Sequence, residues 1–168
     1  MKVRANATVL QVGDRHPSQE SYAEPGSGLE VNVVYTTPPG ALAALRTAGT
    51  RQLEARVRLL VPQAVPHCLP VTRPPVPIAF TEARCRRMAL ECSDAVEVQI
   101  HVYLCRDRRQ GLRAALKPHS LVVVGGSRRW WRTPEEKLAT LLRSDGHHVI
   151  FADANCGPAP AAPRAGTT

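Results

Sequence analysis

The chain has 168 residues, and its 22 Lys and Arg against 14 Asp and Glu give a formal charge of +8. This length is enough to bury a hydrophobic core in one domain, and the 43% hydrophobic composition is that of an ordinary globular protein. No apolar run approaches the roughly 18 residues that cross a bilayer. The first residues lack the apolar region of a secretory signal, so we expect a cytoplasmic protein.

The excess positive charge lies in the middle of the chain and is almost entirely arginine. Lys2, Lys117 and Lys137 are the only lysines. Two interpretations remain open, since arginine-rich, alanine-rich and proline-rich chains arise from GC-rich genomes, whereas basic clusters also bind nucleic acid.

The two ends of the chain differ in composition from its centre. Residues 1–30 are expected to form a flexible leader, because 13–28 carry turn formers and little to bury. Residues 8–12 either add a short strand or are part of this leader. Residues 154–168 form a tail rich in proline and alanine that we expect to be disordered. The folded domain is therefore predicted over residues 31–153.

Five strands are predicted within this domain, at 31–35, 57–61, 96–104, 121–124 and 149–152. The run at 121–124 is continuously apolar, as in a central parallel strand that is covered on both faces. Residues 96–104 instead alternate apolar and polar side chains, which is typical of an edge or antiparallel strand and predicts an exposed His101.

Four helices are predicted between these strands. The first carries Leu42, Leu45, Gly49 and Leu53 on one face, and the second places Cys85 and Cys92 in an apolar stripe that favours core packing. A third helix is predicted to begin at Asp107, and a fourth at Thr133 with Pro134 and Glu136. Six prolines predict a long, stiff loop over 62–77, with no regular structure.

Strands that alternate with helices in this way indicate an α/β fold with a doubly wound parallel sheet. Ligands bind such sheets beyond the carboxyl ends of the strands, where the strand order reverses. Here that point lies between the first and fourth strands. The candidate ligand-binding residues at these strand ends are Thr36, Thr37, Val61, Gly125, Gly126, Ser127, Arg128, Arg129 and Trp130.

The order of these segments and their local amino-acid sequences resemble the universal stress protein family. The resemblance rests on the Ala/Leu run at 41–45, on 55–60, on 118–125 and on the closing strand at 149, and it covers about 31–153. It implies a five-stranded Rossmann-type sheet in the order 3-2-1-4-5, with the 96–104 strand at an edge. It also implies a homodimer through the last strand, at Val149, Ile150 and Phe151.

One branch of that family binds ATP through a Gly-x-x-Gly-x9-Gly-Ser/Thr pattern, and this chain departs from it. Gly125 fits the first position, but Arg128 stands at the second and Leu138-Ala139 at the third. The resemblance therefore implies ATP or AMP as a cofactor only through a modified site.

The modified segment, residues 125–132, holds three arginines and both tryptophans of the chain. Arginines can clamp a phosphate and an indole can stack on a base. In the alternative interpretation, Trp130 or Trp131 packs over the sheet as a plug and the arginines are solvated. A basic rim is also predicted, because loops after the third and fourth strands emerge at one end of a parallel sheet. Its members would be Arg106, Arg108, Arg109 and Arg132, beside Arg128 and Arg129.

Catalytic and metal-binding motifs do not appear in the sequence. No Cys-x-x-Cys, Walker loop or Gly-x-Ser-x-Gly is present, so we predict neither a metal site nor an enzyme. The sequence favours a universal-stress-protein-like stress or regulatory protein that binds a nucleotide or another small anion at 125–132. The alternatives are a basic nucleic-acid-associated module, a ligand-free dimeric protein-interaction domain, and a nucleotide-hydrolysing relative.

Overall fold

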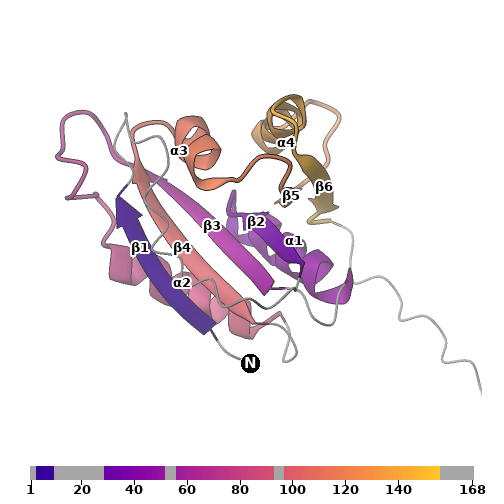
Figure 1. The fold of residues 1–168 in the computed structure, drawn as a ribbon, viewed down its shortest axis with the longest axis horizontal. Coiled ribbons are helices and arrows are strands. Elements are labelled where there is room, and N and C mark those ends of the chain that lie inside the picture. The colour runs from indigo at the N-terminus through magenta and orange to yellow at the C-terminus, as the bar shows by residue number, and fades with distance from the viewer. Residues whose placement is uncertain (1–2, 10–28, 52–55, 93–96, 156–168) are drawn as a thin grey trace, which may run out of the picture.

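The computed structural model describes residues 3–9, 29–51, 56–92 and 97–155. Within these residues, parallel strands form a six-stranded sheet in the order β1-β4-β3-β2-β5-β6 (Figure 1). The strands are β1 (Val3–Val9), β2 (Glu30–Val34), β3 (Arg56–Ala64), β4 (Val98–Cys105), β5 (Leu121–Gly126) and β6 (His148–Asp153). The helices are α1 (Pro38–Arg51), α2 (Ile78–Leu90), α3 (Arg108–Ala115) and α4 (Pro134–Ser144).

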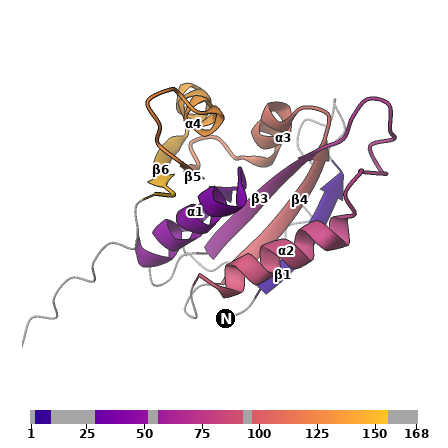
Figure 2. The same cartoon turned by 180° about the vertical axis from the view of Figure 1, so that it is seen from behind.

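The helices cover both faces of the sheet. Helices α1 and α2 pack on one face, which Figure 2 shows from the front, and α3 and α4 pack on the other. Each face has its own buried core, one around Val33, Leu59 and Ile100 and the other around Val34, Leu60 and Leu112. The predicted doubly wound α/β fold is confirmed, and β4-β3-β2-β5-β6 has the expected order 3-2-1-4-5.

The predicted helix starts are also confirmed. The carboxylate of Asp107 accepts hydrogen bonds from the backbone N–H groups of Arg109 and Gln110 at the start of α3. Thr133 and Glu136 form a reciprocal capping box at the start of α4, with Pro134 at the first helical position. Leu53, which was expected on the first helix, lies outside the described residues.

The prediction that 62–77 lacks regular structure is wrong for its first residues, because β3 continues through Pro62 to Ala64. Backbone groups alternate sides along a strand. Val57 donates toward β4 and Leu60 accepts from Tyr35 beyond β2, so Pro62 directs its nitrogen to the β2 side. Because β2 has ended at Val34, the missing N–H of Pro62 costs no ladder hydrogen bond.

The expected edge position of the third predicted strand is also wrong. This strand is β4, and β1 pairs with it along its outer side from Val3↔Val98 to Val9↔Leu104. Strand β1 runs over Val3–Val9, inside the segment expected to be a flexible leader. Of the strand predicted at 8–12, Thr8 and Val9 belong to β1, and 10–12 lie outside the described residues. The rest of that leader, and the tail beyond residue 155, lie outside the described residues.

His101 on β4 is half-buried rather than exposed. Its ring stacks on Tyr103, with 6.2 Å between the ring centroids. Its Nε2 atom is buried without a hydrogen-bond partner among the described residues. Burial, together with the nearby Arg58 guanidinium, lowers the pKa of His101 to about 4, although Glu30 partly opposes the shift. The alternating pattern marks a strand that is only partly covered by α3, not one at the sheet edge.

Candidate anion-binding site

The point between β2 and β5, where ligands were expected, is closed by a backbone contact. A Cβ atom on Gly125 would lie 1.8 Å from the carbonyl oxygen of Gly40, so the start of α1 rests directly on the end of β5. The Thr36 hydroxyl donates to the Gly125 carbonyl at 2.7 Å, and the Gly40 N–H donates to the Thr37 hydroxyl at 3.3 Å. Thr36 therefore ties the start of α1 to the sheet, and Thr37 accepts a hydrogen bond from the first turn of the helix.

Two other predicted residues lie inside the protein. Val61 is only 4% exposed and belongs to the core beneath α1 and α2. Gly126 is buried under the first turn of α4, where an added Cβ would lie 2.7 Å from the Cβ of Glu135. In the folded protein, the glycines at 125–126 allow close packing of helices on the sheet.

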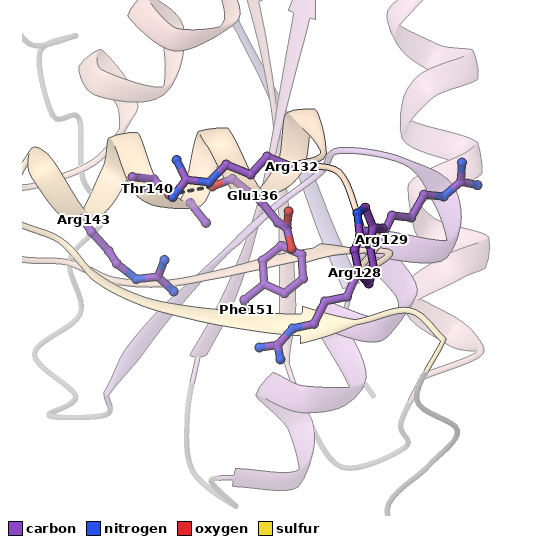
Figure 3. A pocket seen from close by; sticks show the side chains of 9 residues that line it. Arg128, Arg129, Arg132, Glu136, Thr140, Arg143 and Phe151 are labelled. Atoms are coloured by element: carbon purple, nitrogen blue, oxygen red, sulfur yellow. Dashed lines mark hydrogen bonds between the residues drawn. The ribbon is translucent and has the colours of Figure 1, made fainter.

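The chain then leaves the sheet and forms an open pocket of about 430 Å³. The loop after β5, the outer face of α4 and the side of β6 contribute its walls (Figure 3). The residues that line it are Arg128, Arg129, Trp130, Arg132, Glu136, Ala139, Thr140, Arg143 and Phe151. Three consecutive predicted residues and one predicted rim arginine are thus gathered at one place.

The pocket is strongly basic, since four arginines and one glutamate line it. The Arg128 guanidinium lies 5.8 Å from the centre of the Phe151 ring, and Arg143 donates to the Val149 carbonyl at 3.2 Å. Figure 3 shows Arg128 and Arg143 on different sides of Phe151, with Arg129 extending away from it. The ion pairs found among the described residues, Arg58–Glu30 and Arg113–Asp145, involve none of these arginines.

Glu136 contributes its negative charge to the pocket, but its carboxylate has a structural role. It accepts a hydrogen bond from the Thr133 N–H at 3.1 Å and closes the capping box of α4. The Thr140 hydroxyl donates to the Glu136 carbonyl one turn later. The box fixes where α4 begins, and Arg143 further along the same helix donates to the Val149 carbonyl of β6.

The exposure of the two tryptophans rules out the interpretation that one of them packs over the sheet. Trp130 is 95% exposed and Trp131 is 79% exposed, so neither packs over the sheet as a plug. Ser127 is half-buried beside them. The loop is anchored by the Arg128 N–H, which donates to the carboxylate of Asp153, the last residue of β6, at 3.5 Å.

The arginines that follow β4 do not line this pocket. Arg106 donates to the carbonyl oxygens of Val65 at 3.1 Å and of Pro66, which attaches it to the proline-rich loop. Arg108 and Arg109 are exposed at the start of α3. Strands β3 and β2 separate β4 from β5, so the predicted rim arginines divide into two groups.

Arg143, Thr140 and Glu136 were not identified from the sequence as site residues. Their spacing on α4, three and four positions apart, places them on one helix face. The sequence shows this spacing, but no feature of the α4 sequence predicts that this face lines a pocket together with the loop after β5.

The remaining candidate groups give no further chemistry. Cys85 and Cys92 are free and lie in or against the core, and burial raises the pKa of Cys85 to about 11, which keeps its thiol protonated and unreactive. No group of three or more His, Cys, Asp or Glu side chains is placed to hold a metal ion within the described ranges.

Comparison of the chain with models of protein families, with curated proteins and with solved structures returns no match. No helix in the described part of the chain is both long enough and apolar enough to cross a membrane.

Proposed function

We propose that this chain is a universal-stress-protein-like, non-enzymatic regulatory protein that binds a phosphate-bearing anion in the pocket between the 127–132 loop, α4 and β6. The observation that carries the proposal is the lining of this pocket, with four arginines and a single glutamate that already serves as a helix cap. Arginine presents donors in a fork that matches phosphate oxygens. The strand order β4-β3-β2-β5-β6 supports the family assignment.

The chemistry of the lining also favours binding without turnover. Arginine stays protonated throughout the physiological range, so it supplies charge but no proton transfer. The one carboxylate in the pocket is hydrogen-bonded to the Thr133 N–H. A phosphate monoester acquires its second charge near pH 6, so affinity is expected to rise as pH increases through about 6.

The test is thermal unfolding with ATP, AMP, a cyclic dinucleotide, pyrophosphate or inorganic phosphate. A ligand present at about 100 times its Kd stabilises the folded state by about 2.7 kcal/mol, which gives a clear rise in Tm. Nucleotides are also followed for hydrolysis, and none is expected.

The variant Arg128→Ala/Arg143→Ala is expected to lose this stabilisation. The matched control is Arg86→Ala/Arg87→Ala, which removes the same charge from exposed positions of α2 on the opposite face. The proposal is overturned if no phosphate compound raises the Tm, or if both variants respond like the wild-type protein.

A second candidate function, a homodimeric interaction module, rests on the outer edge of β6. The N–H groups of His148 and Ala154 bond toward β5, so by alternation the backbone groups of Val149 and Phe151 face outward. The Val149 carbonyl already accepts a hydrogen bond from Arg143. A partner strand would have to displace the Arg143 side chain. Sedimentation of the wild-type protein and the Arg143→Ala variant tests this. The variant frees the Val149 carbonyl for a partner strand, so it is expected to form more dimer.

A further inference from the structure

The two tryptophans have no role in the folded core, which is unusual for the largest apolar side chains of the chain. The sequence contains two tryptophans, at neighbouring positions, and they are 95% and 79% exposed. Burying an aromatic ring is among the largest favourable contributions that a side chain makes to stability. A loop that displays both indoles to solvent therefore points to contacts outside this chain.

Their exposure suits stacking on planar rings. An indole that is 95% exposed has both of its faces accessible, so a base can lie against either of them. Stacking tolerates any base, because every base has a π face. Two indoles at successive positions can accept more than one base, whereas one nucleotide offers only one.

The cationic groups around the loop are spread out rather than aimed at one point. Arg128 and Arg143 lie on different sides of Phe151, and Arg129 extends in another direction (Figure 3). The pocket is open to solvent and does not enclose a ligand. Separated guanidinium groups on an open surface match successive phosphates along a strand better than the phosphate of one small molecule.

A duplex fits this surface less well than a single strand. Double-stranded DNA is read by an element that enters a groove, usually a helix or a β-ribbon. Here both tryptophans and three of the four arginines extend from an irregular loop. In a duplex the faces of internal bases are already stacked. Only unpaired bases leave a face free for the tryptophans.

We propose that the 127–132 loop, together with Arg143 of α4, binds single-stranded nucleic acid, with phosphates at the arginines and bases stacked on Trp130 and Trp131. This proposal rests on the anion site described above and names its ligand class as a polynucleotide instead of a small anion. Binding is independent of base sequence, because none of these contacts reads a base edge.

The test uses intrinsic tryptophan fluorescence, which in this chain reports only on the loop. The full-length protein is titrated with a ten-nucleotide oligo(dT), with an abasic oligomer of the same length, with inorganic polyphosphate and with a duplex. The oligo(dT) is expected to quench the fluorescence and to bind about tenfold or more tightly than the abasic oligomer, which is the usual scale for base stacking.

Three variants separate stacking from charge. Trp130→Leu and Trp131→Leu are each expected to weaken oligo(dT) binding, measured by anisotropy of a labelled strand, by about tenfold while polyphosphate binding is unchanged. Arg128→Ala/Arg143→Ala is expected to reduce the slope of log K against log salt by about 1.4, for two lost phosphate contacts. Arg86→Ala/Arg87→Ala is the control and is expected to leave the slope unchanged.

The outcomes distinguish this inference from the function on which it rests. If the abasic oligomer or the duplex binds as tightly as oligo(dT), or if the tryptophan variants bind oligo(dT) like the wild-type protein, the single-strand inference is overturned while anion binding stands. If none of the polyanions binds, the single-strand inference is overturned, and the proposed function fails with it only if the small phosphate compounds also leave the Tm unchanged.

Discussion

The surroundings of single residues in this protein follow only in part from the pattern of polar and apolar residues in the sequence. His101 occupies a polar position in an alternating strand, yet it stacks on Tyr103 and leaves its buried Nε2 atom without a partner among the described residues. Pro62 lies within a strand because its nitrogen faces the side where β2 has already ended. In both cases the residue type was visible in the sequence, but its surroundings were not.

The stability of the protein is expected to fall in mild acid because of His101. Its pKa is about 4 in the folded state, mainly through burial, against about 6.5 in an unfolded chain. Between these values the unfolded chain takes up a proton that the folded state does not bind. The contribution of His101 to the free energy of unfolding should therefore be constant above about pH 7 and should decrease as the pH falls from about 6.5 toward 4.

His101→Phe keeps an aromatic ring against Tyr103 and removes the titrating group, so its loss of stability over this pH range should be smaller. Urea unfolding at several pH values measures the difference. His148→Phe, at an exposed position, serves as control. His147, whose pKa burial also lowers, leaves some acid sensitivity in every variant. Equal pH slopes for His101→Phe and the wild-type protein would show that His101 is not a buried neutral group.

At the scale of elements, the packing of helices on strands explains most of the segment between β5 and α4. Gly125 fits the first position of a phosphate-binding glycine pattern, but here Gly125 and Gly126 admit α1 and α4 to close contact with the sheet. Local rules predicted the starts of α3 and α4 well, because an N-cap involves residues only two or three positions apart. The contact of α1 with β5 joins residues far apart in sequence, and no local rule reports it.

Gly125→Ala should therefore be far more destabilising than an ordinary glycine substitution. The added Cβ meets the backbone of Gly40, which no side-chain rotation can relieve, and a loss above about 3 kcal/mol in the free energy of unfolding is expected. Gly146→Ala is the matched comparison. Gly146 has φ +87°, and its replacement should cost only about 1 kcal/mol. Urea denaturation measures both, and similar values would mean that α1 and β5 are not in backbone contact.

The whole molecule is a five-stranded doubly wound sheet extended by one strand from the N-terminal segment. β1 covers the outer side of β4 from Val98 to Leu104. Without β1, the apolar strand β4 would present an unpaired edge, and such edges pair with other chains. The N-terminal segment is therefore expected to contribute to stability and to limit self-association.

Deletion of residues 1–9 tests this expectation, because it removes β1 and keeps the remainder of the leader. The variant should unfold at lower urea concentration than the full chain and should form higher-mass species in sedimentation. Removal of the last nine residues, 160–168, is the control for the loss of an equal length of chain. Unchanged stability and mass in the 1–9 deletion would show that pairing of β1 with β4 does not hold in solution.

The sequence by itself determined the class of the strands β2 to β6 and of the four helices, the caps of α3 and α4, the α/β alternation and the presence of a basic, tryptophan-bearing loop. These properties follow from side-chain periodicity and hydrogen bonds within a few residues, which a single chain displays directly. The tertiary structure decided that β1 covers β4, that Pro62 is tolerated in β3, that Gly125 packs on Gly40, and that Arg143 joins Arg128 beside Phe151. Each of these depends on which distant segments the sheet order places side by side.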